Sequence, residues 1–326
     1  MIPIQEDFEV YRERPGFTSW KVPAFCNNDW IALTLLDMCE EIGVEQPFHV
    51  AYGTPQCLWA GGRPSAIRQK MTEAELERYF EAYDRHGVKV ALTLSRLSLN
   101  TSDLKDPYCN MILDVAERHG AEAIVVENKL ARHIRKTHPG IRLIGSLDKP
   151  IIDLSPGYDD ETGYYLRNLE LYDEVVVRCE YAIDPELIGQ LPEDCRDRVE
   201  VIVNQICIPN CPDCRKHIGA IEEWNHEGCH GQCQVCFHAD VASDLKRRLK
   251  ANVFISTRRI NQLVEMGVYK MKIGGRNAPI PKFLDLLSTY VFEPSGAFIP
   301  MRVAMSNDYR TAMQRNPRLA PWSLPE

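Results

Sequence analysis

Short runs of apolar, β-favouring residues alternate with amphipathic helical patterns along most of this chain, and this alternation restricts the possible folds more than any other feature of the sequence. Within the runs, apolar residues do not alternate with polar ones, which is typical of parallel strands buried on both faces. The eight candidate strands cover residues 47–53, 88–94, 121–127, 141–147, 172–180, 199–207, 252–257 and 268–275. We therefore predict an α/β fold built on a parallel sheet.

Helix start and stop signals lie between these runs. Residues 72–87 begin with a capping box, in which Thr72 is followed three residues later by Glu75, and they end at Gly87. Further helices are predicted at residues 28–43, 107–120 and 257–267, each of which ends at a glycine. Each of these helices leads into the next strand within a few residues.

Strands and helices in this order fit either a doubly wound open sheet or a closed barrel. Eight strands over about 230 residues favour the barrel, and no glycine-rich dinucleotide-binding sequence follows the first candidate strand to favour the open sheet. We predict a single (β/α)8 TIM-like barrel over residues 1–290, including an N-terminal extension, and a C-terminal extension of residues 291–326 packed on it. In such a barrel, functional side chains lie where strands end and the following loops begin.

Two pairs of charged residues stand at strand ends and are our candidate catalytic residues. Arg178 and Glu180 follow the fifth candidate strand; being two apart on a strand they face the same way, either into the barrel mouth or as an internal ion pair. Lys272 and Arg276 flank the end of the last strand, where an arginine could hold a carboxylate in bidentate fashion; a surface salt bridge is the alternative. The other strand-end candidates are Gln56, Cys57, Ser95, Arg96, Glu127, Asn128, Ser146, Asp148, Asn204, Thr257 and Arg258, with Arg63 in a nearby glycine-containing loop.

Half of the twelve cysteines lie in one segment after the sixth candidate strand, together with His217, His226 and His230. The clustered cysteines are Cys207, Cys211, Cys214, Cys229, Cys233 and Cys236. The N-terminus lacks the apolar core of a signal peptide, and no apolar run reaches the roughly 20 residues that cross a bilayer, so a cytoplasmic location without a membrane span is expected. In that reducing compartment, clustered thiols are more typical of metal binding than of disulfides.

Two metal centres are compatible with the cysteine spacing. Cys211 with Cys214, and Cys233 with Cys236, form two CxxC pairs separated by 18 residues, which suits a structural zinc ion. An iron–sulfur cluster also takes four thiolates but depends less on paired CxxC spacing. Cys207, which lies outside the two CxxC pairs, could then be one of its ligands. The residues alone leave both possibilities open.

Four stretches of the chain resemble the collagenase-like peptidase family U32, which includes the ubiquinone-biosynthesis proteins UbiU and UbiV and several RNA hydroxylation proteins. They are RCE after YDEVVV, then VNQICIPNCPDC, EGCHGQC and INQLVEMGVYKMKIGGR, and the resemblance spans about residues 48–290. It implies a barrel that carries a [4Fe–4S] cluster, and it favours iron–sulfur over zinc.

The resemblance also implies a set of cluster ligands. Matched position by position, the family's two cysteine pairs fall on Cys207, Cys214, Cys229 and Cys233. Cys211 and Cys236 are then extra candidates, and some members use a cysteine after the first strand that would fall on Cys57. This chain departs from the family at Gly274, where glutamate is usual, and it lacks the fuller peptidase signature.

We therefore expect an oxygen-independent hydroxylase, or a related iron–sulfur oxidoreductase, that acts on a small aromatic or carboxylate-bearing substrate. The cluster would hold or activate an oxygen donor, and Arg178, Lys272 and Arg276 would bind the negative charge of that donor. The alternatives are a peptidase-like protein, a zinc-stapled module that binds a homologous partner or a second copy of itself, and an RNA-modifying hydroxylase. A net charge of -8 makes binding to nucleic acid unfavourable.

Overall fold

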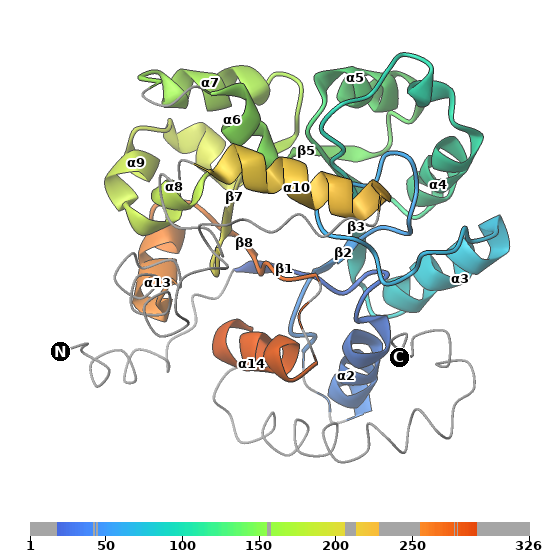
Figure 1. The fold of residues 1–326 in the computed structure, drawn as a ribbon. Helices are drawn as coiled ribbons and strands as arrows, with labels where there is room; N and C mark the ends of the chain where they lie inside the picture. The colour runs from blue at the N-terminus through green and yellow to red at the C-terminus, as the bar shows by residue number, and fades with distance from the viewer. Residues whose placement is uncertain are drawn as a thin grey trace.

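Eight parallel strands close into a barrel, so the predicted (β/α)8 TIM-like architecture is confirmed (Figure 1). The structure is a computed structural model and describes residues 18–41, 43, 45–154, 158–205, 213–227, 255–276, 278 and 280–291. The strands are β1 (Ser19–Val22), β2 (Val50–Gly53), β3 (Lys89–Leu94), β4 (Glu122–Val125), β5 (Arg142–Gly145), β6 (Glu174–Val176), β7 (Val199–Ile202) and β8 (Lys270–Lys272). Each strand pairs with the next along the chain, and β1 pairs with β8 to close the barrel.

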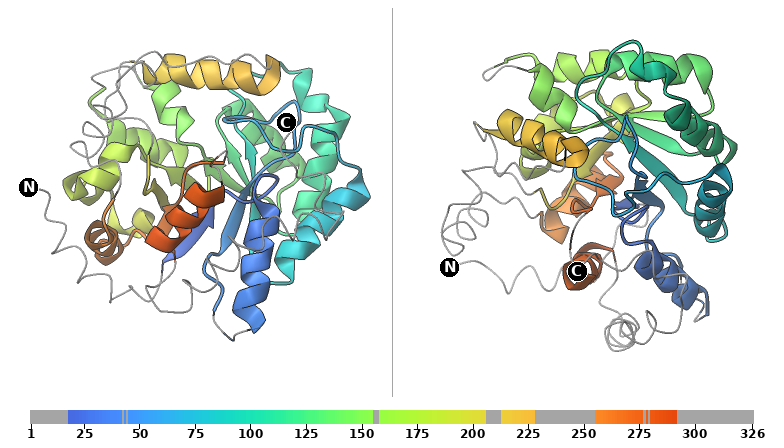
Figure 2. Two further views of the ribbon diagram at one scale, coloured as in Figure 1. Left: turned by 60° about the horizontal axis from the view of Figure 1, so that its bottom comes forward. Right: turned by 45° about the vertical axis from the view of Figure 1, so that its right-hand side comes forward.

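Helices surround the barrel and shield it from water (Figure 2). Those outside the barrel wall and at its mouth are α2 (Asp29–Glu41), α3 (Glu73–Asp84), α4 (Pro107–Arg118), α5 (Asn128–Thr137), α6 (Asp148–Asp153), α7 (Glu161–Asn168), α8 (Cys179–Ile183), α9 (Pro185–Gly189), α10 (Cys214–Glu227), α13 (Thr257–Glu265) and α14 (Ile280–Tyr290). The capping box before α3 is present, because Thr72 Oγ1 accepts from the Glu75 N–H and the Glu75 carboxylate accepts from the Thr72 N–H. Gly87, which follows α3, has a φ of 66°, which only glycine adopts without strain.

The structure differs from the prediction in two strands: it contains one barrel strand that was not predicted, and one predicted strand is not part of the barrel. The first barrel strand is β1, which lies before all eight candidates, and β7 pairs directly with β8, so the predicted strand at 252–257 does not stand between them. In its described part, the Ile255 N–H donates to the Val203 carbonyl at 2.8 Å and α13 begins at Thr257. The segment that carries the clustered cysteines therefore follows the seventh strand rather than the sixth.

Strand β1 escaped detection because a charged residue interrupts it. Lys21 stands inside the barrel, where its ammonium lies 2.9 Å from Glu122 Oε2 and 2.8 Å from Glu200 Oε2. Burial alone would lower the pKa of Lys21, but the attraction of Glu200 and Glu122 is larger and holds the pKa above its usual range. A buried, paired lysine is thus what made a barrel strand look polar.

Apolar side chains fill the rest of the barrel interior. The buried residues that pack together there are Val50, Tyr52, Ala91, Ile124, Ile144, Val176 and Ile202. These positions follow the alternation that parallel strands require, with one side chain inward for each one packed outward against the helices.

The proposed extensions lie mostly outside the described residues. Residues 1–17 are not described, and of 291–326 only Val291, which is buried directly after α14, is described. Helix α14 packs Phe283 and Leu287 into the core. Among the helices of the described segments, none is both long and apolar enough to cross a membrane.

Candidate functional site at the barrel mouth

Helix α10 lies across the carboxyl ends of the barrel strands and roofs the mouth (Figure 1). Loops after β2 and β3 hold it in place: Asn225 Nδ2 donates to the Gly62 carbonyl at 2.9 Å, and Glu222 Oε1 accepts from the Leu97 N–H at 2.9 Å. At its other end, Arg215 donates to carbonyl groups at the end of α6. The helix therefore closes a space that in an open barrel would face water.

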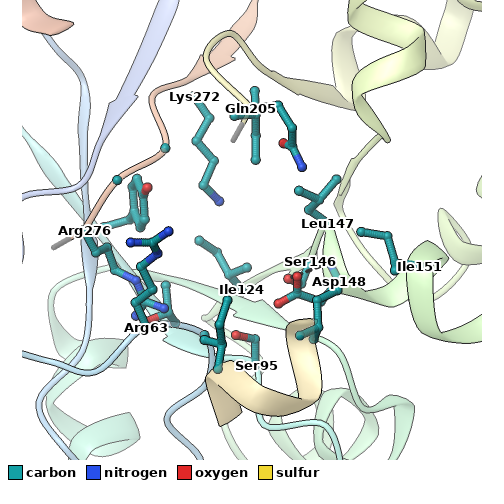
Figure 3. Close-up of a pocket in the computed structure, with 18 of the residues that line it drawn as sticks. Arg63, Ser95, Ile124, Ser146, Leu147, Asp148, Ile151, Gln205, Lys272 and Arg276 are labelled. Carbon is teal, nitrogen blue, oxygen red and sulfur yellow. Dashed lines mark hydrogen bonds between the residues drawn. The ribbon is translucent and has the colours of Figure 1, made fainter. Parts of the chain in front are cut away.

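A cavity of about 190 Å³ lies between α10 and the barrel (Figure 3). Its charged lining residues are Arg63, Asp148, Lys272 and Arg276; its other polar ones include Thr93, Ser95, Ser146, Asn204, Gln205, Cys214 and His217; and its apolar ones include Tyr52, Ile124, Leu147, Ile151, Ile202, Ile218 and Ile221. A concave, mostly apolar space with a few convergent polar groups is the usual form of a small-molecule site, and the barrel mouth is its usual place.

Arg276 is the most firmly positioned cation of the cavity. It is buried, its Nη1 donates to Thr93 Oγ1 at 2.5 Å, and its Nη2 donates to the Gly61 carbonyl at 2.6 Å. The neighbouring Gly62 has a φ of 66°, and a Cβ atom there would stand 2.3 Å from Arg276 Nη2. Glycine at position 62 is therefore needed for the guanidinium to reach its position.

Lys272 brings an ammonium group to the same space from the end of β8. Its Nζ lies 3.3 Å from Glu200 Oε1 and 4.6 Å from the centre of the Tyr52 ring, in a cation–π contact. Burial lowers the pKa of Lys272, and Lys21 and Arg276 lower it further, while Glu200 opposes them. Of the two lysines that contact Glu200, only Lys272 lines the cavity.

A carboxyl group stands across the cavity from the cations (Figure 3). Asp148 opens α6, and its backbone N–H donates to Ser146 Oγ at 3.3 Å. Burial raises the pKa of Asp148, although Arg276 and Lys272 act in the opposite direction. The cavity thus has a cationic side and, facing it, an acid that can hold a proton nearer to neutral pH than an exposed aspartate can.

The structure places Arg178 and Glu180 away from this cavity. Strand β6 ends at Val176, Arg178 precedes α8 and Glu180 lies in the first turn of that helix, so the expected alternation on a strand is wrong. Arg178 Nε lies 3.0 Å from Glu161 Oε1 and 3.6 Å from Glu180 Oε2. These residues pair with each other outside the barrel strands rather than as an ion pair inside the barrel, and their catalytic role stays a prediction.

Several other strand-end candidates line the cavity, whereas some do not. Those in the lining are Ser95, Ser146, Asp148, Asn204, Lys272 and Arg276, with Arg63 from the adjacent loop; Gln56, Cys57, Arg96, Glu127, Asn128 and Arg258 are not among them. Sequence reasoning missed Tyr52 and Thr93, which point inward from within β2 and β3. Side chains along a strand alternate between the inside and the outside of the barrel. That alternation would have identified Tyr52 and Thr93 if the register had shown which face points inward.

Of the six clustered cysteines, Cys214 is the one within the described residues. It is half-buried, begins α10 and lines the cavity. The predicted ligands Cys207, Cys211, Cys229, Cys233 and Cys236 lie outside the described residues.

Cys57, the alternative ligand, lies in a different environment. It is buried, it hydrogen-bonds with the Cys109 side chain, and it is not among the residues that line the cavity. Among the described residues, one group of three side chains could hold a metal ion: Asp37, Glu40 and His86, with both carboxylates exposed. That group is also not part of the cavity lining.

Comparisons with known proteins give structural likeness only. No protein-family model matches the chain, and no curated protein matches it. Among solved structures, the U32 peptidase Mk0906 is 12% identical with a TM-score of 0.48, over 82% of this chain and 96% of that one. The 3-keto-D-glucoside 4-epimerase YcjR from E. coli is 14% identical with a TM-score of 0.34, over 84% of this chain and 90% of that one. These values assign neither a family nor an activity, and the barrel rests on its own strand pairing.

Proposed function

We propose that this protein is an iron–sulfur oxidoreductase, of the oxygen-independent hydroxylase kind, that binds a small carboxylate-bearing substrate at the barrel mouth. One observation carries the proposal. Cys214, which the sequence predicts as a metal ligand, lines the same cavity as Lys272 and Arg276, which the sequence predicts as cations that bind the negative charge of an oxygen donor. A metal ligand and a substrate site that share one cavity are what a metal-dependent oxidoreductase requires.

The lining of the cavity supports a substrate with an anionic end and an apolar body. Arg63, Lys272 and Arg276 supply positive charge on one side, and a planar guanidinium can hold both oxygens of a carboxylate. Isoleucine side chains from β4, β7 and α10 supply the apolar wall, against which an aromatic ring would pack. Helix α10 covers part of the mouth, and a reduced access of water there would strengthen each of these electrostatic contacts.

The residues present fit the cofactor in the chemistry of their donors. Thiolates are the ligands of a [4Fe–4S] cluster, and Cys214 offers one at the edge of the cavity. When bound, the cluster would supply one-electron transfer. The chain's own residues would orient the substrate through Lys272 and Arg276, and Asp148 would hold or release a proton at its carboxyl oxygen.

Anaerobic metal analysis of the full chain tests the proposal. We expect about four irons and about four sulfides for each chain, with broad visible absorbance. Cys214→Ser should lower the iron content and the absorbance. Cys195→Ser is the matched control, because Cys195 is buried away from the cavity and donates to the Pro192 carbonyl, which a serine can also do.

A zinc content of about one for each chain, with no labile sulfide, would contradict the proposal and support the zinc-stapled module instead. Replacement of Cys207, Cys229 and Cys233 by serine, one at a time, then identifies the remaining ligands. Loss of colour in all four variants supports the ligand set that the family resemblance implies. Loss confined to the Cys207 and Cys214 variants would instead exclude Cys229 and Cys233 as ligands.

A further inference from the structure

The geometry points to a covalent role for Lys272: its amine forms a Schiff base with a 2-oxo acid, whose carboxylate is held by Arg63 and Arg276. This inference goes beyond the proposed function. It uses the same cavity, but it depends on no metal and on no electron transfer. The substrate class that it names, a carbonyl next to a carboxylate, is one that the anionic end of the proposed substrate would share.

Lys272 differs from the other buried lysine beside it. Glu200 contacts both, but the contact with Lys21 is 2.8 Å long and the contact with Lys272 is 3.3 Å long. Lys21 also contacts Glu122 at 2.9 Å and is not among the residues that line the cavity, whereas Lys272 extends into the cavity (Figure 3). Lys21 is thus locked as a structural cation, and Lys272 is the amine that a ligand can reach.

Charged and titratable groups from every element around Lys272 set its protonation. Glu200 on β7 favours the ammonium form, while Lys21 on β1 and Arg276 after β8 favour the neutral amine, as does burial itself. The Tyr52 ring on β2 contacts the amine from one side, and Asp148 on α6 stands across the cavity. The pKa of Lys272 is lowered overall, and a neutral amine is the form that attacks a carbonyl carbon.

The positions of the guanidinium groups favour an oxo acid over a simple ketone. Arg276 is fixed by Thr93 and Gly61, and Arg63 lies beside it, with Lys272 directed at the same space (Figure 3). A carboxylate held by these guanidinium groups would bring the neighbouring carbonyl carbon towards the amine. An anion without a carbonyl would bind in the same place but would not react.

Groups that line the cavity can supply every bond and proton that imine formation requires. The Lys272 nitrogen forms a bond to the carbonyl carbon, and the carbonyl oxygen leaves as water. That oxygen takes one proton from the amine itself and one from Asp148, whose pKa is raised by burial so that it can carry a proton. The product is a protonated imine, which keeps one positive charge beside Glu200, and no oxidant or reductant takes part.

Reductive trapping on the full-length protein tests the inference. The protein is incubated anaerobically at neutral pH with pyruvate and cyanoborohydride, and the labelled lysines are identified by peptide mapping. We expect labelling at Lys272 to exceed that at Lys216, which is 86% exposed on α10 and serves as an internal reference, by about tenfold or more. Acetone, which has the carbonyl but no carboxylate, should label Lys272 much less.

Two variants separate the covalent role from simple attraction. Lys272→Arg keeps the cation but cannot form the imine, so the adduct should disappear while Lys216 is still labelled. Arg63→Gln should raise the pyruvate concentration for half-maximal labelling by about tenfold, since one charged contact is lost. Because the mapping of the unaltered protein needs no variant, misfolding of a variant does not remove the test.

Labelling that follows exposure, with Lys216 modified and Lys272 not, overturns the inference. An adduct that persists in Lys272→Arg overturns it as well. The trapping result is independent of the metal analysis. Trapping at Lys272 in a protein that binds no iron would support this inference and contradict the proposed function. A protein that contains the cluster but is not trapped at Lys272 would support the proposed function and contradict this inference.

Discussion

At the scale of single residues, the barrel interior depends on a carboxylate shared by two ammonium groups. Glu200 is fully buried and contacts both Lys21 and Lys272. Burial raises the pKa of Glu200, but the two lysines outweigh it, so the pKa lies below the ordinary value of 4.5. This residue therefore links the structural ion pairs of Lys21 to the cation in the cavity.

Replacing Glu200 by glutamine should destabilise the protein strongly. Lys272 then loses its described carboxylate partner and Lys21 keeps only Glu122, and an uncompensated buried charge typically costs about 3–5 kcal/mol. Urea unfolding at pH 7 measures the loss, with Glu223→Gln on the exposed face of α10 as a control that should change little.

The same substitution has a defined pH dependence. Because the folded pKa of Glu200 is depressed, its stabilising contribution is complete above the unfolded pKa of about 4.5 and is lost as the pH falls through the folded pKa. The difference in unfolding free energy between wild type and Glu200→Gln should therefore shrink in acid. A difference that stays constant from pH 7 down to pH about 3 would contradict the ion-pair description.

A second residue-scale prediction concerns Gly62. Gly62→Ala adds a Cβ atom that meets Arg276 Nη2, so the guanidinium must move and binding of a small aromatic carboxylate such as 4-hydroxybenzoate should weaken by about tenfold. Gly43→Ala is the matched control, since Gly43 has a φ of 68° but nothing within 4 Å of the added atom. Both variants should lose about 1 kcal/mol of stability from the positive φ, but the control should keep its affinity in calorimetric titration.

At the scale of secondary-structure elements, α10 decides whether the barrel mouth is a cavity or an open surface. Its side chains Cys214, His217, Ile218 and Ile221 line the cavity, and hydrogen bonds to the loops after β2 and β3 hold it there. Its sequence shows an amphipathic helix, but nothing in that pattern says which loops it contacts. The contacts join residues more than 100 positions apart, so only the closed barrel creates them.

Loosening this helix should open the cavity without unfolding the barrel. Asn225→Ala removes the hydrogen bond to the Gly62 carbonyl, which contributes about 1 kcal/mol. We expect faster hydrogen–deuterium exchange along α10 and a few-fold weaker binding of 4-hydroxybenzoate. Glu223→Ala on the exposed side of the same helix should change neither, and equal effects from both variants would show that α10 does not act as a roof.

At the scale of the whole molecule, β1 is the element that closes the barrel. It pairs with both β2 and β8, and Trp20 and Val22 are buried. If this short strand is an integral part of the barrel, disrupting it should destabilise all the other strands together. A peripheral N-terminal strand would instead detach on its own.

Val22→Ala distinguishes these cases. Val22 is fully buried, and truncating it should cost about 2–3 kcal/mol. The unfolding midpoints in near-ultraviolet and far-ultraviolet circular dichroism should fall together, since the barrel unfolds as one unit. Separate midpoints, with an early transition confined to the near-ultraviolet signal of Trp20, would contradict closure by β1.

The sequence by itself determined the alternation of strands and helices, the capping box before α3 and the strand-end positions of Lys272, Arg276, Asp148 and Ser146, because propensities, caps and buried strands leave local patterns. It did not determine β1, because the charge of Lys21 looks unfavourable until Glu122 and Glu200 are brought beside it from distant strands. Only the tertiary structure decided that Arg178 pairs with Glu161 outside the cavity lining and that α10 brings Cys214 to the cavity. These are contacts between residues far apart in the chain, and their energies exist only once the barrel has closed.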